Sequence, residues 1–237
     1  MITSDSAAER PLQSSVKSLS MSDFTLEPHH TVIVGMTGCG KTTFVNRLLL
    51  NDEAAACRFI FDDLNRMWPR LKLSCCYTSE QLAASLATRW SAVNPVKLLP
   101  LFGGDAKKAF RWWCKWVFNR AAAGPGKKIV CIPEVWRHCN PDSIPPELAL
   151  LAQAGREVGV ELVLDTQQPE LLNGSVTGAC TEIVVMRLMN PDGVRAVNKI
   201  LLGAGIVAAA DQLCQQPPGS FVGFNRISGG SLAGRVF

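Results

Sequence analysis

The run Gly35-Met-Thr-Gly-Cys-Gly-Lys-Thr42 constrains this chain more than any other feature, because it fits the phosphate-binding pattern G-x-x-x-x-G-K-[ST] in full. A short β-branched run, Thr31 to Gly35, precedes it and predicts a buried strand. Apolar residues at helical spacing follow from Lys41 to Leu50 and predict a helix. Because such a loop needs a strand before it and a helix after it, the pattern predicts a phosphate-binding loop, or P-loop.

The residue types of this loop suit a triphosphate. Glycines allow the backbone to turn so that successive N–H groups face one anion, and the start of the helix adds its positive dipole end. We expect Lys41 to reach the β- and γ-phosphates, Thr42 to hold Mg²⁺ through its hydroxyl, and Thr43 to bond the α-phosphate. The predicted residues for binding ATP and Mg²⁺ are Gly35, Met36, Thr37, Gly38, Cys39, Gly40, Lys41, Thr42 and Thr43.

Strand and helix patterns alternate along nearly the whole chain. Strands are predicted at 31–35, 58–62, 73–77, 129–132, 160–164, 182–188 and 219–226. Helices are predicted at 41–50, 79–90, 105–123, 146–158 and 191–203. This alternation predicts an α/β fold with a mostly parallel central sheet and helices on both faces, whose ligands bind at the carboxyl ends of the strands.

Composition agrees with a packed domain. Hydrophobic residues make up 47% of the chain and charged residues 19%. The Ser-rich residues 1–28 predict a flexible arm, and 29–237 one P-loop domain. No secretory signal is visible, and the longest apolar run, 200–210, is shorter than the roughly 20 residues that cross a bilayer. The net charge of +4 does not by itself indicate nucleic-acid binding.

Glu134 is the predicted catalytic carboxylate. It follows the apolar run Ile129 to Ile132, and an acid at the end of such a strand can polarise the water that attacks the γ-phosphate. Pro133 occupies the preceding position, where P-loop enzymes usually carry an Asp that assists Mg²⁺. Either Thr42 and waters suffice, or another acid that follows a strand replaces it: Asp62, Asp63 or Asp165.

Three further residues are predicted to assist hydrolysis. Gln167 follows the strand at 160–164 and is placed to sense the γ-phosphate or to position water. Arg156 and Arg187 are candidates for an arginine finger, a guanidinium delivered to a neighbouring subunit's γ-phosphate.

The stretch from Pro146 to Pro169 resembles the FtsK–HerA superfamily of P-loop translocases. It shows a helix with Gly155-Arg156, a Gly-Val turn, a strand, and then Thr166-Gln-Gln-Pro169. The later run from Glu182 to Leu188 is also similar, and the match covers about residues 29–226. The resemblance implies a RecA-like fold of the ASCE type.

Among these translocases, the chain most resembles the genome-packaging ATPases of tectivirus-like viruses, which have an internal membrane and double-stranded DNA. The resemblance implies ATP-driven translocation of double-stranded DNA into a capsid, in the virion or the host cytoplasm. It also implies a ring, commonly a hexamer, with capsid vertex or internal membrane proteins as possible partners. Two loops are candidate DNA contacts, 136–141 and 172–178.

Two alternatives remain open from the sequence. Because Pro133 offers no carboxylate, the chain is alternatively a nucleotide-gated assembly protein with little turnover. The other alternative is a cellular DNA motor of the same superfamily.

Overall fold

The computed structural model describes residues 29–51, 55–62, 75–76, 90–93 and 102–237 of the chain. Within these ranges the strands form one sheet in the order β3-β4-β2-β5-β6-β1-β7-β8-β9. Their bounds are Thr31–Val34 (β1), Ala55–Phe61 (β2), Cys75–Cys76 (β3), Trp90–Val93 (β4), Lys127–Ile132 (β5), Val160–Thr166 (β6), Glu182–Met186 (β7), Ser220–Asn225 (β8) and Ser231–Arg235 (β9).

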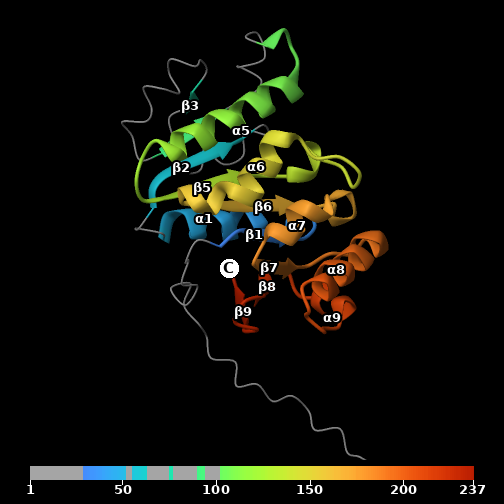
Figure 1. Cartoon of the computed structure of the whole chain (residues 1–237). Coiled ribbons are helices and arrows are strands. Elements are labelled where there is room, and N and C mark those ends of the chain that lie inside the picture. The colour runs from blue at the N-terminus through green and yellow to red at the C-terminus, as the bar shows by residue number, and fades with distance from the viewer. Residues whose placement is uncertain (1–28, 52–54, 63–74, 77–89, 94–101) are drawn as a thin grey trace, which may run out of the picture.

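Helices cover both faces of the sheet (Figure 1). The α-helices are Lys41–Asn51 (α1), Ala106–Ala122 (α5), Pro146–Ala154 (α6), Gly174–Ala179 (α7), Pro191–Gly203 (α8) and Ala210–Cys214 (α9). The 3₁₀ helices of the described ranges are Val135–Arg137 (η4), Gly155–Val158 (η5) and Pro169–Leu171 (η6). None of these helices is both long enough and apolar enough to cross a bilayer.

The sheet is parallel from β3 to β7, and the β8–β9 hairpin continues it antiparallel. The predicted α/β fold with a mostly parallel sheet is therefore confirmed. Parallel order places the carboxyl ends of β5, β6, β1 and β7 along one edge. Because β9 is antiparallel to β8, it runs in the same direction as β7 and ends at this carboxyl edge too.

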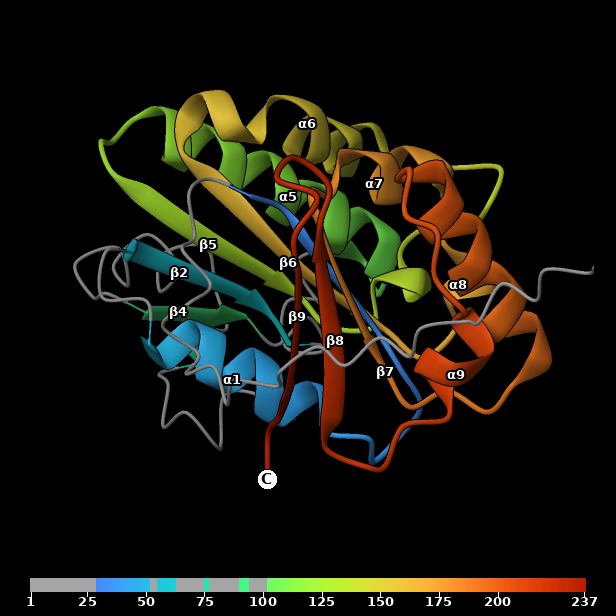
Figure 2. The same cartoon turned by 90° about the horizontal axis from the view of Figure 1, so that it is seen from below.

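Alternating side chains of β1 divide the core into two layers. Val32 and Val34 belong to the larger layer, which also contains buried residues of α5, α6, α7 and α8. Ile33 points to the other face, where it clusters with α1 residues such as Phe44 and Leu49. Figure 2 shows α1 on the opposite side of the sheet from α5 and α6. Because both faces are covered, β1 is wholly buried, as its apolar sequence predicts.

Some predicted elements differ from the structure. Trp90, the predicted end of a helix, begins β4; the rest of that helix lies outside the described residues, as does the arm at 1–28. The helix predicted at 146–158 ends at Ala154 and continues as η5. The strand predicted at 182–188 ends at Met186, because the Leu188 N–H bonds the Cys214 carbonyl instead of a strand. Strands β4 and β9 and helices α7 and α9 were not predicted.

Candidate functional site

The P-loop connects β1 to α1 at the carboxyl edge. Gly38 and Gly40 have φ angles of +77° and +107°, values that favour glycine. A Cβ on Gly35 would lie 2.7 Å from the Cys39 Sγ, so that position also requires glycine. Within the described part of the chain, no hydrogen bond is found for the main-chain N–H groups of Gly38, Gly40 and Thr42. Unsatisfied donors at the start of a helix are the groups that bind phosphate, so the loop fits a triphosphate.

Lys41 lies against its own loop. Its ammonium donates to the carbonyl oxygens of Gly35 at 2.7 Å and Met36 at 3.2 Å. The same nitrogen is 3.9 Å from Oε1 of Glu134, and both side chains are buried. The structure therefore brings together the predicted phosphate-binding lysine and the predicted catalytic carboxylate.

Main-chain bonds fix the loop to three strands. The Gly35 N–H donates to Thr166 at the end of β6, and the Met36 N–H donates to the Arg187 carbonyl just after β7. The Gly219 N–H, just before β8, donates to the Cys39 carbonyl. Burial raises the pKa of the Cys39 thiol, which therefore stays neutral near pH 7. The loop is thus held on both sides of β1.

Glu134 accepts hydrogen bonds from three donors. The indole Nε1 of Trp136 lies 2.9 Å and the main-chain N–H of Gln167 3.0 Å from Oε2, while the Gln167 side-chain amide donates to Oε1. Glu134 is the one described non-glycine residue with a positive φ, at 49°. Such a backbone costs about 1–3 kcal/mol and is typical of functional positions. The turn lets the chain leave β5 abruptly into η4.

Gln167 joins the P-loop to Glu134. Its Oε1 accepts a hydrogen bond from the Thr37 hydroxyl, and its Nε2 donates to Glu134. Thr37, Gln167, Glu134 and Trp136 therefore form a continuous chain of hydrogen bonds from the phosphate loop to η4. The sequence predicted Gln167 and Glu134 as neighbours of the loop, and the structure places both there.

Asp165 is the acid that the structure places beside Glu134 and the P-loop strand. It lies in β6 opposite Ile33 of β1, is buried, and accepts the Glu134 N–H at 3.0 Å. Asp62 is also fully buried but follows β2, which is three places from β1 in the sheet. Asp63, the third predicted substitute for the acid missing at Pro133, lies outside the described residues. No group of three metal-ligating side chains occurs among the described residues.

The two predicted arginines lie at opposite ends of the strands. Arg187 follows β7 at the carboxyl edge, half-buried, and its carbonyl bonds the P-loop. Arg156 lies in η5, before β6 begins, so it is at the amino edge, away from its own P-loop. Its guanidinium donates to the carbonyl of Ala179, which precedes β7. The structure therefore does not bring Arg156 to the P-loop of its own chain.

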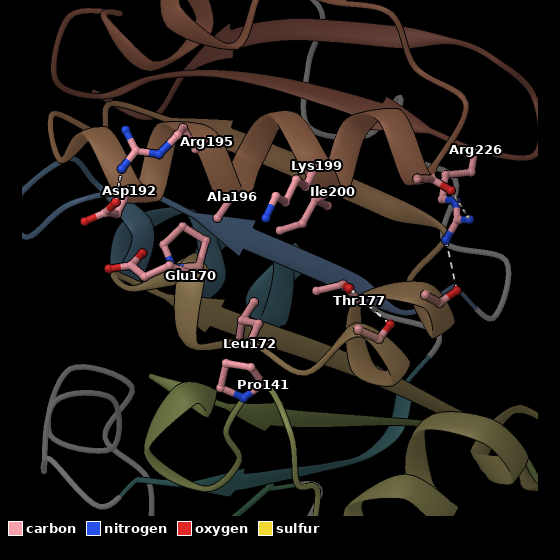
Figure 3. Close-up of a pocket in the computed structure, with 14 residues that line it drawn as sticks. Pro141, Glu170, Leu172, Thr177, Asp192, Arg195, Ala196, Lys199, Ile200 and Arg226 are labelled. Carbon is pink, nitrogen blue, oxygen red and sulfur yellow. Dashed lines mark hydrogen bonds and ion pairs between the residues drawn. The ribbon is translucent and has the colours of Figure 1, made fainter.

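A groove of about 650 Å³ lies between η6, α7 and α8, next to the segment that carries Gln167 (Figure 3). Figure 3 shows the Lys199 and Ile200 side chains reaching from α8 into the groove. Arg195 pairs with Asp192 at one end. At the other end, Arg226 donates to the carbonyls of Gly178, Cys180 and Gly203.

The two segments predicted as DNA-contacting loops lie together beside this groove, but the expected flexible loop at 172–178 is wrong: most of it is helix α7, which the Asn173 side chain caps by accepting the Ser175 N–H. The side-chain amide of Asn173 donates to the carbonyls of Asn140 and Pro141, at 3.3 Å and 2.8 Å. Leu172 and Pro141 both line the groove. The Asn173 side chain therefore connects the segment that follows Glu134 with the segment that follows Gln167.

Sequence reasoning missed the neighbours that the β8–β9 hairpin brings to the P-loop. A Cβ on Gly40 would lie 2.7 Å from Cγ2 of Val236 and 3.1 Å from the Phe237 ring. The one local sequence signal for this contact is the glycine at 219, which has a φ of +82° just before β8 begins. Because β9 was not predicted, nothing in the sequence pattern placed residues 236–237 at the site.

No family model matches this sequence, and no curated protein matches it either. Solved structures do match. The genome packaging NTPase B204 from Sulfolobus turreted icosahedral virus 2, in complex with AMPPCP, has a TM-score of 0.62 at 15% identity, over 89% of this chain and 99% of B204. VirB4 of Thermoanaerobacter pseudethanolicus has a TM-score of 0.64 at 10% identity, over 88% and 89% of the two chains.

A third match is the cytoplasmic domain of the type VII secretion ATPase EccC from Thermomonospora curvata. It has a TM-score of 0.52 at 14% identity, over 88% of this chain and 24% of EccC. At 10–15% identity these matches show the fold alone: the chain has the α/β fold of these ATPases.

Proposed function

We propose, from the premise that the chain has the fold of the FtsK–HerA P-loop ATPases, that it hydrolyses ATP to move double-stranded DNA into a viral capsid. The observation that carries this proposal is the hydrogen-bonded chain from Thr37 through Gln167 to Glu134 beside a P-loop with unsatisfied N–H groups. This arrangement provides a phosphate-binding loop and a buried carboxylate, with 3.9 Å between Oε1 of Glu134 and Nζ of Lys41. The similar fold of B204, a genome packaging NTPase, supports the same activity.

In this proposal the loop N–H groups and Lys41 bind the phosphates, while Thr43 bonds the α-phosphate. Glu134 accepts a proton from the attacking water, and Gln167 positions that water. Mg²⁺ would neutralise charge on the β- and γ-phosphates. Thr42 would hold the ion, and we assign the acid missing at Pro133 to Asp165, because it is buried beside Glu134 and the P-loop strand.

We assign a ring of subunits, most simply a hexamer, to complete the site. Arg156 is the better candidate for the arginine finger, because it lies at the edge away from its own P-loop and can serve only a neighbour. It would first have to leave the Ala179 carbonyl. Arg187 lies beside its own loop and is assigned to the same subunit's nucleotide.

We place the duplex against the two segments that Asn173 connects, 136–141 and 172–178, and against the groove beside them. Lys199 is exposed in this groove, and within the described residues it forms no ion pair, so its ammonium is available to a phosphate. The contacts would be to the DNA backbone and would carry little sequence information.

The test is ATP hydrolysis with and without double-stranded DNA, for the wild type, Lys41→Ala and Glu134→Gln. We expect DNA to stimulate the wild type, and both variants to lose at least 100-fold in turnover. Wild-type protein without turnover under any DNA condition contradicts the motor.

A second candidate function has its own support. Three hydrogen-bond donors already occupy the Glu134 carboxylate, so a water must displace one of them before it can bond there, which suits an assembly protein that binds ATP but hardly hydrolyses it. ATP-dependent ring formation, with the same low turnover in the wild type and Glu134→Gln, would favour this alternative.

A further inference from the structure

The two sides of the P-loop differ in chemistry. Gln167 and Glu134 follow β6 and β5, which lie on one side of β1 in the sheet. The terminal phosphate of a triphosphate belongs on that side, because it must face the catalytic carboxylate. The nucleoside end therefore belongs on the other side of β1, toward β7, β8 and β9.

On that other side, residues of the β8–β9 hairpin contact the P-loop directly. The Gly219 N–H donates to the Cys39 carbonyl, and the Val236 N–H donates to the Gly219 carbonyl, at 2.9 Å and 2.8 Å. Val236 is fully buried against Gly40. These contacts fix the chain that follows β9 beside the beginning of α1, and Figure 2 shows it running there.

The Phe237 ring lies on two glycines. A Cβ on Gly219 would lie 2.7 Å from the ring, and a Cβ on Gly40 would lie 3.1 Å from it. Gly219 has a φ of +82° and Gly40 of +107°, so both positions favour glycine. Although one side of the ring packs on these two glycines, 63% of Phe237 remains exposed. An aromatic ring is thus fixed beside the phosphate loop with much of its surface turned to solvent.

We propose that Phe237 is the wall against which the nucleobase of a bound nucleotide stacks; this rests on the proposed nucleotide site. A base offers a flat π-face to a phenyl ring, and the ring is already positioned by Gly219 and Gly40. Stacking of this kind does not read the hydrogen-bonding groups of a base. Phe237 therefore strengthens binding of adenine and guanine nucleotides alike and contributes nothing to binding of a bare triphosphate chain.

The experiment measures the affinity of ATP, GTP and inorganic tripolyphosphate, each with Mg²⁺, by titration calorimetry. The proteins are the full-length wild type, Phe237→Ala and Phe237→Trp. Ile227→Ala is the matched control, because Ile227 is 70% exposed and lies at the opposite end of the same hairpin. We expect Phe237→Ala to weaken ATP and GTP by roughly 5- to 100-fold and to leave tripolyphosphate within about two-fold. Phe237→Trp and the control should bind all three as the wild type does.

Two results overturn the inference alone. Equal weakening of ATP and tripolyphosphate in Phe237→Ala would mean that the ring only supports the loop. Unchanged ATP binding would mean that the base lies elsewhere. Wild-type protein that binds neither ATP nor tripolyphosphate overturns the nucleotide site itself, so failure of the proposed function is distinguishable from failure of this inference.

Discussion

The indole N–H of Trp136 donates to the carboxylate of Glu134, with 2.9 Å between Nε1 and Oε2. Trp136 belongs to η4, and the chain continues from there into the loop that Asn173 holds at Asn140 and Pro141. The residue proposed to activate water is therefore bonded to the start of a loop proposed to touch DNA. Under the proposed function, a movement of that loop that breaks this hydrogen bond would leave Oε2 with one donor fewer and open a position for water.

Replacing Trp136 by Phe removes this donor and keeps an aromatic ring. We expect hydrolysis without DNA to rise about 10- to 100-fold, because a hydrogen bond to a charged group is worth roughly 1.5–3 kcal/mol, and stimulation by DNA to fall. Turnover with and without DNA measures both effects. Trp112→Phe is the control, since Trp112 packs on Phe102 in another part of the chain. Lower turnover under both conditions would instead assign Trp136 to positioning Glu134 for catalysis.

Asp165→Asn tests the acid that replaces the one missing at Pro133. The amide oxygen of Asn can still accept the Glu134 N–H, so the fold should be retained. We expect the Mg²⁺ concentration for half-maximal hydrolysis to rise about 10-fold, because the negative charge near the ion is lost. Asp62→Asn serves as the comparison, as Asp62 is equally buried but follows a more distant strand. An unchanged Mg²⁺ titration in Asp165→Asn would rule out this assignment.

Stability should fall in mild acid because of His30. Burial lowers the pKa of His30 to about 4, and Leu162 N–H donates to Nδ1 while Nε2 bonds the Ala152 carbonyl. The neutral ring therefore stabilises the fold fully above pH 6.5, and this stability is lost as the pH falls from 6.5 toward 4. We expect a loss of about 2 kcal/mol from His30 between pH 7 and pH 5.

Urea unfolding at the two pH values measures this loss. His138, whose pKa burial also lowers to about 4, adds to it in the same direction. His30→Gln keeps a donor and an acceptor but does not titrate, so its stability should depend less on pH. Equal pH dependence in the wild type and this variant would contradict the role of His30.

Lys199→Ala should weaken double-stranded DNA binding at every sequence. Loss of one phosphate contact per subunit lowers the slope of log affinity against log salt by about 1. Salt-dependent binding assays measure that slope. Hydrolysis without DNA should stay unchanged. Lys108→Ala is the control, because it removes the same charge from an exposed position on α5 that does not line the groove. If both variants shift the slope equally, the groove has no special part in binding.

The sequence predicted the parts of the site that local patterns encode. The P-loop, β1, α1 and the strand leading to Glu134 follow from runs of fewer than a dozen residues. Ser231–Arg235 was not predicted because its short S-L-A-G-R run contains a glycine and no β-branched or aromatic residue. The Asp165 contact with Glu134 joins residues 31 positions apart. Such pairs depend on which strands are neighbours, and periodicity does not specify that.

The two carbonyls that bind the Lys41 ammonium have a consequence for exchange of nucleotide. Under the proposed function, a triphosphate would have to compete with the carbonyl oxygens of Gly35 and Met36 for the Lys41 ammonium. After the product leaves, the Lys41 ammonium would return to these two carbonyl oxygens, which remain beside it. Because these carbonyls belong to the loop itself, they would compete with product phosphates for the ammonium in every cycle and would thereby favour release of the product.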